Sequence, residues 1–549
     1  MRAGISIRFF FILFQTILCS YFNHAISQPA ILWQNCRGGQ GGEIAYSVVT
    51  TSDSGFVMCG QTNANSGEVS GFHSSFNGND DGWIVKTDSV GNFQWQICLG
   101  DTMLEILYSV IQTADGGYLA CGRTFSNSGM VTGNHGDSDG WLVKIDNSGN
   151  FVWQKCYGGT SSDYFKRIIA TDNDHYLVCG ATSSNDGDVT GNHSSNPNSF
   201  DAWALKVDNN GAIIWQKCFG GSGDEIFNSV ILNQNNQLAF CGATSSNDFD
   251  VSGNHADSTG AFNNDIWVAI ADTAGNLLSQ KCFGGSLAES ATDIIQTSDS
   301  GYAMTGTSTS NDGDVSGNHI SLSFDYLDTW TIKTDNVLNL QFQNCFGGSF
   351  GDGGTSIIET NDGNLAITGS ADSYDGDVTC NHNSSGSLTS DAFVVKYDNS
   401  GSLIWHKCLG GSGSEGGYAL VYDYNDNLIM AGQAKSFDGD VVGLHGLEDF
   451  WIVALANDSL TGLNPDQGAN STFDVFPNPV NNYLQIVLNE KMVAATHVKL
   501  TDISGKEILS QHLSMNRTSI DVAGIENGIY FLTVNDERKT FTVKILIQH

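Results

Sequence analysis

The chain has 549 residues, 40% of them hydrophobic, which is ample for a large core. Its 59 acidic and 23 basic residues give a net charge of −36, which repels phosphate backbones and anionic lipid and argues against a nucleic-acid partner. Aspartate outnumbers lysine throughout and there are only five prolines, so we expect the charge to lie in the loops of a folded domain.

Residues 1–27 are predicted to be a signal peptide. A short basic segment precedes a mostly apolar run of about eleven residues, which is too short to span a membrane. The small residues Ala25 and Ser27 favour cleavage before Gln28, whereas Leu18 before Cys19 fits a lipoprotein box poorly. We therefore expect export without a lipid anchor. No later stretch is apolar enough to be a transmembrane segment.

A phrase of about sixty residues then occurs seven times. Counted from a cysteine, an acidic residue follows at position seven and a histidine at position thirty-seven, and an aspartate then stands two residues before an aromatic. The cysteines are Cys36, Cys98, Cys156, Cys218, Cys282, Cys345 and Cys408. The acidic residues are Glu43, Glu105, Asp163, Glu225, Glu289, Asp352 and Glu415. The histidines are His73, His135, His193, His255, His319, His382 and His445, and the aspartates are Asp81, Asp139, Asp201, Asp265, Asp328, Asp391 and Asp449.

Each repeat contains four β-rich runs, which predict one antiparallel sheet. In the third repeat these runs are 167–170, 176–179, 203–207 and 213–218, and the turn residues 208–211 favour a tight hairpin before the last run. Most runs are apolar on both faces, as expected when neighbouring sheets cover a sheet on each side. The sequence therefore predicts an all-β fold, a seven-bladed β-propeller.

The order of the runs also predicts how the ring closes. The fourth-strand phrase first appears at 31–36, before any complete repeat, and the last repeat ends at Leu455 without a fourth strand. We expect strand 31–36 to complete the seventh blade, so that residues 28–456 form a closed ring without exposed edges. The phrase Trp-Gln-Lys-Cys-Phe-Gly-Gly resembles propeller-like repeat proteins secreted by Bacteroidota.

The last part of the chain differs from the repeats. A polar linker is expected at 457–472, and alternating apolar runs predict a small β-sandwich at 473–549. Its motifs are Phe-Pro-Asn-Pro at 476–479, a Val-to-Ile segment at 498–508 and Asn-Gly-Ile-Tyr-Phe-Leu-Thr-Val at 527–534. In this order they closely resemble the type A sorting domain of the bacterial type IX (Por) secretion system. The resemblance implies a Bacteroidota host, passage through the periplasm and across the outer membrane to the cell surface or medium, and contact between 473–549 and the secretion machinery.

The thirteen cysteines are expected to be mainly buried thiols. Four repeats carry a second cysteine, namely Cys59, Cys121, Cys179 and Cys241. The later repeats have Thr305, Thr368 and Ala431 there but keep the first cysteine, which argues against a disulfide within each repeat. In a four-strand meander the two positions would be about 9.5 Å apart, beyond disulfide reach.

The recurrent histidines and carboxylates have two interpretations. They could form seven metal sites, but a constellation present in every blade is favoured to be a hydrogen-bonded structural network. Paired aspartates before the histidines could hold calcium, although the twelfth-position glutamate of an EF-hand is missing and turns explain the pattern as well. The candidate calcium ligands are Asp186, Asp188, Asp312, Asp314, Asp375, Asp377, Asp438 and Asp440. No other cofactor is expected.

All variation in repeat length falls between the histidine and the aromatic. Loops of this kind share one face of the ring and can build a binding surface, or they can vary because nothing constrains them. Their candidate binding residues are Phe200, Phe262, Phe324, Tyr326 and Leu327, with Phe76 as a further aromatic. We expect a monomeric secreted or surface protein that binds carbohydrate or protein. The alternatives are a glycan hydrolase or lyase, since short enzyme motifs are absent but carboxylates are plentiful, and a calcium-stiffened structural protein.

Overall fold

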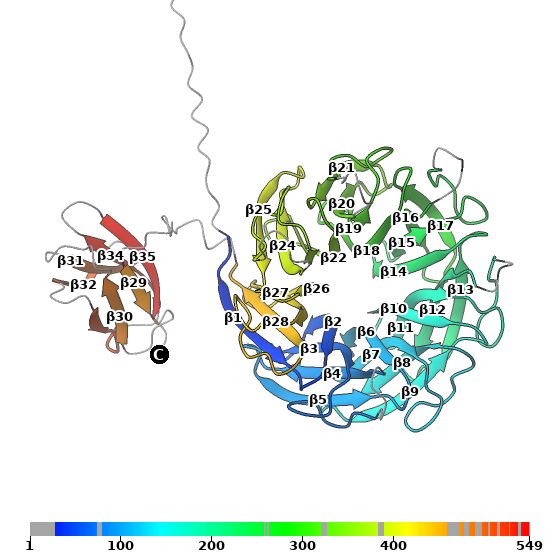
Figure 1. The fold of residues 1–549 in the computed structure, drawn as a ribbon, viewed down its shortest axis with the longest axis horizontal. Helices are drawn as coiled ribbons and strands as arrows, with labels where there is room; N and C mark the ends of the chain where they lie inside the picture. The colour runs from blue at the N-terminus through cyan, green and yellow to red at the C-terminus, as the bar shows by residue number, and fades with distance from the viewer. Residues whose placement is uncertain are drawn as a thin grey trace, which may run out of the picture.

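The computed structural model shows a ring of β-sheets followed by a separate pair of small sheets (Figure 1). It describes residues 28–73, 79–194, 196, 198–256, 260, 263–319, 327–382, 389–457, 473–476, 483–488, 497–502, 506–512, 517–525, 528–535 and 540–547. The predicted signal peptide, nearly all of the predicted linker, and Phe76, Phe262, Phe324 and Tyr326 lie outside the described residues.

Seven four-stranded antiparallel sheets form the ring, as predicted. The first three consist of β2 (Glu43–Thr50), β3 (Phe56–Thr62), β4 (Asp81–Thr87) and β5 (Phe93–Leu99); β6 (Glu105–Gln112), β7 (Tyr118–Thr124), β8 (Asp139–Ile145) and β9 (Phe151–Tyr157); and β10 (Asp163–Ala170), β11 (His175–Thr182), β12 (Asp201–Asp208) and β13 (Ile213–Phe219). The next two consist of β14 (Glu225–Leu232), β15 (Leu238–Thr244), β16 (Asp265–Ala271) and β17 (Leu277–Phe283); and β18 (Glu289–Gln296), β19 (Tyr302–Ser308), β20 (Asp328–Thr334) and β21 (Leu340–Phe346). The sixth consists of β22 (Asp352–Glu359), β23 (Leu365–Ala371), β24 (Asp391–Tyr397) and β25 (Leu403–Leu409), and the seventh of β26 (Gly416–Tyr422), β27 (Leu428–Ala434), β28 (Asp449–Leu455) and β1 (Ile31–Arg37).

The core lies between the blades. The third strand is buried along its whole length in six blades, because its two faces pack on the preceding and the following sheet. One apolar cluster, for example, joins Val57 and Ile84 of the first blade to Leu107 and Trp141 of the second. The outer strands are partly exposed at the perimeter. This sandwiching explains the apolar residues on both faces of the runs.

The ring closes as predicted, because the N-terminal strand β1 pairs with β28 in the seventh blade. Cys36 is paired with Trp451, and the register places the repeat phrase of β1 where each other blade has its own fourth strand. The rings of Trp83 and Phe450 also meet at 4.5 Å between the first and seventh blades. Closure covers the two apolar sheet faces that an open array would expose, since the first blade packs on the seventh.

The C-terminal sheets form the small sandwich that the sequence predicts. One sheet has the order β29 (Phe473–Phe476), β30 (Tyr483–Leu488) and β33 (Arg517–Asp521). The other has the order β32 (Glu507–His512), β31 (His497–Asp502), β34 (Gly528–Asn535) and β35 (Thr540–Ile547). They share a core of their own that includes Leu484, Val498 and Leu532. In the described residues no helix is long and apolar enough to span a membrane.

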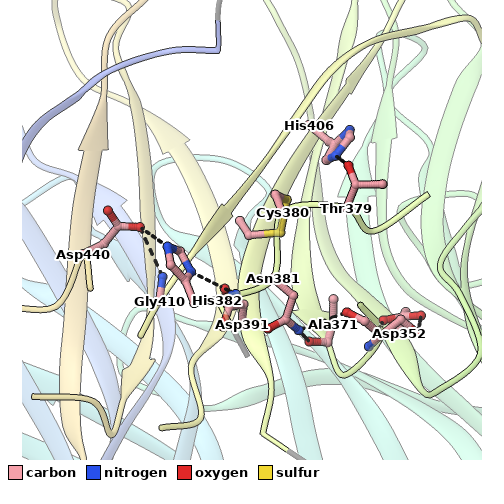
Figure 2. Close-up of a disulfide and its surroundings, with 12 residues drawn as sticks. Asp352, Ala371, Thr379, Cys380, Asn381, His382, Asp391, His406, Gly410 and Asp440 are labelled. Atoms are coloured by element: carbon pink, nitrogen blue, oxygen red, sulfur yellow. Dashed lines mark hydrogen bonds and ion pairs between the residues drawn. A yellow bond between two sulfur atoms is a disulfide. The ribbon is translucent and has the colours of Figure 1, made fainter. Parts of the chain in front are cut away.

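The cysteine prediction is wrong at one place. Cys408 forms a disulfide with Cys380, whose Cα lies 5.4 Å away in the long loop of the sixth blade (Figure 2). Cys380 stands two positions before His382, where the other six repeats have glycine. The loop reaches over the outer strand, so one cysteine there meets the repeat cysteine. Ten other cysteines are free, including those of all four predicted unbonded pairs.

Candidate functional site

Each predicted histidine lies beside the predicted aspartate of its own blade. The histidine Nδ1 and an aspartate Oδ2 are 2.5 to 2.8 Å apart in all seven blades, and each of these aspartate side chains is buried. In three blades the other ring nitrogen approaches an aspartate of the next blade, as His382 does with Asp440 at 3.7 Å (Figure 2). These three histidines therefore stand between blades, within reach of two carboxylates.

The charges around these histidines affect their protonation. Burial acts to lower the pKa of His135, but the hydrogen bond and charge of Asp139 outweigh it and raise the pKa above its usual value. The pKa of His319 is raised in the same way by Asp328. A protonated imidazole can donate from both nitrogens, which suits a position between two carboxylates.

The candidate calcium ligands connect two loops of a blade junction. Asp186 accepts hydrogen bonds from the backbone N–H and the hydroxyl of Thr160, both at 2.8 Å. Asp312, Asp375 and Asp438 accept equivalent backbone bonds at 2.7 Å from the serine that follows the Gly-Gly pair of the preceding outer strand. No group of three or more histidine, cysteine or acidic side chains among the described residues is arranged to hold a metal. A calcium role for these residues stays a prediction.

A feature that occurs once lies on the propeller axis. All seven inner strands contain a β-bulge ten residues after the repeat cysteine. A bulge breaks the alternation of a strand and re-aims one side chain. The seven bulged residues line one pocket of about 190 Å³; they are Tyr46, Tyr108, Lys166, Asn228, Thr292, Thr355 and Tyr418. The bulges lie near the strand ends from which the long loops leave, so this pocket, the axial mouth, opens on the long-loop face.

The axial mouth has two unlike halves. In the fourth, fifth and sixth blades the bulged side chains bond to the backbone of the next blade. Asn228 donates to Ala291 O at 2.8 Å, and the Thr292 hydroxyl lies 2.8 Å from Gly354 O. The Thr355 hydroxyl does the same with Gly417 O at 2.7 Å. These polar groups are already satisfied, and they close one half of the mouth.

The other half is aromatic and cationic. Tyr46 lies between Tyr108 and Tyr418, with ring centroids 5.4 and 5.5 Å apart. Lys166 follows in the third blade, with its amino nitrogen 3.9 Å from the centroid of the Tyr108 ring. Burial, and next the positive charge of Arg123, lower the pKa of Lys166 to about 8. Three tyrosines and one lysine thus form a continuous wall across four blades.

Two predicted loop residues pack against the start of an inner strand. The ring of Phe200 is 5.6 Å from that of Tyr164 at the start of β10. Leu327 lies beside Gly353 at the start of β22, where a Cβ added to the glycine would be 3.8 Å from the leucine side chain. Both residues stand immediately before the repeat aspartate, at the position that Asp80 and Glu448 occupy in the first and seventh blades. Burial raises the pKa of both Asp80 and Glu448. A pair of carboxyls unique to these blades therefore stands near Tyr46.

Below the axial mouth is a larger axial cavity of about 410 Å³ with mainly aliphatic walls. The residue that follows the bulged residue is serine in most blades, but Arg167 and Asp293 stand there in the third and fifth blades. Asp293 accepts hydrogen bonds from Ser229 at 2.8 Å and Ser356 at 3.0 Å. The guanidinium of Arg167 has no hydrogen-bond or ion-pair partner among the described residues.

The sequence analysis did not identify these axial residues. It followed the positions that repeat, whereas the bulged position changes from tyrosine to lysine, asparagine and threonine along the chain. That change at a fixed offset was the available signal. The sequence did not show that this side chain faces the axis, because that depends on the bulge. Without a bulge, successive side chains of the strand would alternate between its two faces.

Fold and C-terminal sequence together define an exported β-propeller that carries a type IX sorting domain. Residues 474–548 match the secretion system C-terminal sorting domain family. This domain directs secretion across the outer membrane to the cell surface or the extracellular space and implies contact with the type IX machinery.

Comparison with individual proteins gives only distant similarity. The regulatory protein FlaEY of Caulobacter vibrioides is 23% identical over 262 residues, which are 47% of this chain, and the chain spans 24% of that protein's length. PorZ, a surface component of the type IX secretion system of Porphyromonas gingivalis, is 12% identical with a TM-score of 0.31, covering 90% of this chain and 69% of that one. Sqt1 of Chaetomium thermophilum is 10% identical with a TM-score of 0.39, covering 78% of this chain and all of that one. None of these similarities carries a function to this protein.

Proposed function

We propose that this protein is an extracellular binding protein whose axial mouth takes a carbohydrate. The observation that supports this most is the tyrosine wall of Tyr418, Tyr46 and Tyr108, which occurs once in a fold that otherwise repeats seven times. Flat aromatic faces beside polar side chains are a common way to bind sugar rings, because the rings have apolar faces and hydroxyl edges. A rigid ring with variable loops around one opening suits recognition.

A glycan hydrolase or lyase is the second candidate. It is favoured by the carboxyl pair of Asp80 and Glu448, which only the first and seventh blades carry. Both carboxyls are half-buried and have raised pKa values, as the general acid of a glycosidase requires. The hydrogen-bond partners of these acids also fit a structural role, since Asp80 accepts a bond from Gln61, whose side-chain oxygen in turn accepts one from the Tyr46 hydroxyl.

The test is retention of the purified full chain on a panel of insoluble polysaccharides, with the supernatants assayed for released sugars. Tyr46→Ala and Tyr108→Ala should each reduce retention. The matched control is Tyr424→Ala, which removes an exposed tyrosine from the turn at the opposite ends of the strands. Retention that survives both axial substitutions, or the absence of retention on every polysaccharide, would contradict the proposal. Released sugar that disappears in Glu448→Gln would identify the enzyme instead.

A further inference from the structure

Positive charge gathers on one side of the propeller axis in a strongly acidic protein. Most lysines of the ring that lie near the blade turns pair with an aspartate, as Lys86 does with Asp53 at 2.9 Å and Lys144 with Asp115 at 2.8 Å. In contrast, Arg123, Lys166 and Arg167 have no ion-pair partner in the part of the chain that the structure describes. Three unpaired cations on two adjacent blades are unexpected in a chain of net charge −36.

Local geometry explains why these cations gather. Lys166 and Arg167 are consecutive residues of β10, and in a regular strand their side chains would point to opposite faces. The bulge between Phe165 and Arg167 lets both line the axis, Lys166 at the axial mouth and Arg167 in the axial cavity below it. Arg123 belongs to β7 of the neighbouring blade and is close enough for its charge to lower the pKa of Lys166.

The cations are also incompletely satisfied. The Nε atom of Arg123 is buried without a hydrogen-bond partner among the described residues, and its guanidinium lies over Phe125 at 5.3 Å. The amino group of Lys166 lies over two aromatic rings, Tyr108 at 3.9 Å and Tyr164 at 5.7 Å, and has no ion-pair partner among the described residues. Cations that lose hydration without gaining a counter-charge are unfavourable in isolation, so an anionic ligand group would compensate them.

We propose that the axial mouth binds an anionic sugar unit, with its ring against the tyrosine wall and its carboxylate or sulfate on Lys166 and Arg123. This inference rests on the proposed carbohydrate function and names the ligand class. Asp80 and Glu448 stand near Tyr46 instead of Lys166, where their negative charges disfavour a second negative charge on the ligand. The mouth therefore selects one orientation of a singly charged ring.

Calorimetric titration of the full chain tests this with three probes. These are an oligogalacturonate, its methyl ester as the uncharged match, and a carrageenan oligosaccharide as a source of sulfate. The oligogalacturonate should bind at least about tenfold more tightly than its ester, the effect of one charge-assisted hydrogen bond. If the sulfated probe binds and the oligogalacturonate does not, the anionic group is a sulfate.

Charge substitutions complete the test. Lys166→Gln should lower the affinity for the anionic probe about tenfold and leave the affinity for the ester unchanged, whereas Lys166→Arg should retain affinity for both. Lys281→Gln, on the outer strand β17, is the control with the same loss of charge, and melting curves verify that each variant is folded. Equal affinity for acid and ester overturns this inference but leaves the carbohydrate function standing if Tyr46→Ala abolishes binding. No binding of any probe together with no retention on any polysaccharide overturns both.

Discussion

The indole N–H of Trp451 donates a hydrogen bond of 2.7 Å to the side-chain oxygen of Gln34, 417 positions earlier in the chain. The same bond occurs within other blades over only 13 positions, as between Trp83 and Gln96 at 2.7 Å. One interaction thus serves as a local hairpin contact in most blades and as the closure of the ring in the seventh.

Replacing Gln34 with Leu should weaken closure. The buried indole N–H of Trp451 would lose its partner, at a cost of about 1–3 kcal/mol of unfolding free energy. Gln96→Leu removes the same bond inside a hairpin and should cost a similar amount. Only Gln34→Leu should also release β1, which limited proteolysis would detect as early cleavage near the N-terminus. Identical proteolysis of the two variants would show that β1 does not depend on this bond.

Replacing Cys380 with Ser should destabilise the sixth blade. The disulfide to Cys408 closes a loop of 28 residues, which in the chain-entropy model stabilises by about 3.6 kcal/mol. The melting temperature of the parent protein should fall on reduction, and the variant should be insensitive to the reductant. A parent that melts at the same temperature with and without reductant would contradict this. Cys98→Ser, which removes a free buried thiol, controls for the loss of sulfur.

Gly71→Cys should introduce a second such disulfide. An added Cβ at Gly71 would lie 3.9 Å from the Cβ of Cys98, within the range of real disulfides. The backbone at Gly71 has a positive φ of 87°, so some stability lost to backbone strain would offset the gain. Counting free thiols in the denatured, alkylated protein gives the result directly. A thiol count that rises by one instead of falling by one would exclude the bond.

Alanine at Gly38 should disrupt the junction between the seventh and first blades. Its Cβ would fall 2.7 Å from the Asp449 carboxylate and closer still to that of Glu43, both buried. We expect a loss of at least about 1 kcal/mol in unfolding free energy, as for other overpacked core sites. Gly42→Ala is the matched control, because its Cβ would meet Glu448 at an ordinary 3.5 Å. Equal melting of the two variants would argue against a tight junction.

Stability should pass through a maximum in mild acid. Burial raises the pKa of Glu43 and Asp352 to about 7 and that of Asp163 to about 6. The folded state then binds these protons more tightly than the unfolded state, so their contribution is complete below the unfolded pKa of about 4 and is lost as the pH rises through 6 to 7. Melting curves from pH 3 to 8 should therefore show the highest melting temperature near pH 4 to 5.

The acid limb of that curve has a different origin. Burial acts to raise the pKa of Asp53, Asp115 and Asp299. Hydrogen bonds from a neighbouring threonine and lysine outweigh burial and lower each pKa to about 2. These groups stabilise above pH 4 and lose that contribution as the pH falls towards 2.

Asp352→Asn should flatten only the limb above pH 5, by about 1.4 kcal/mol for each pH unit that the group spans. An unchanged slope would assign that limb to other groups.

The sequence by itself determined the ring, its closure and its route out of the cell. A repeat of about sixty residues with four apolar runs can bury both faces of each sheet only by stacking, and the displaced phrase at 31–36 leaves one way to complete the seventh blade. The sorting motifs are local and could be read directly. The histidine and aspartate positions were also visible, because every blade repeats them.

Only the tertiary structure decided what converges on the axis. Tyr46 and Tyr418 belong to opposite ends of the repeat array, and they meet because ring closure makes the first and seventh blades neighbours. Lys166 and Arg167 share the axis because a bulge cancels the alternation of β10. The disulfide of Cys380 likewise depends on where one loop crosses an outer strand. Repetition fixes the scaffold through local pattern, whereas the site is built from single departures that only three-dimensional closure brings together.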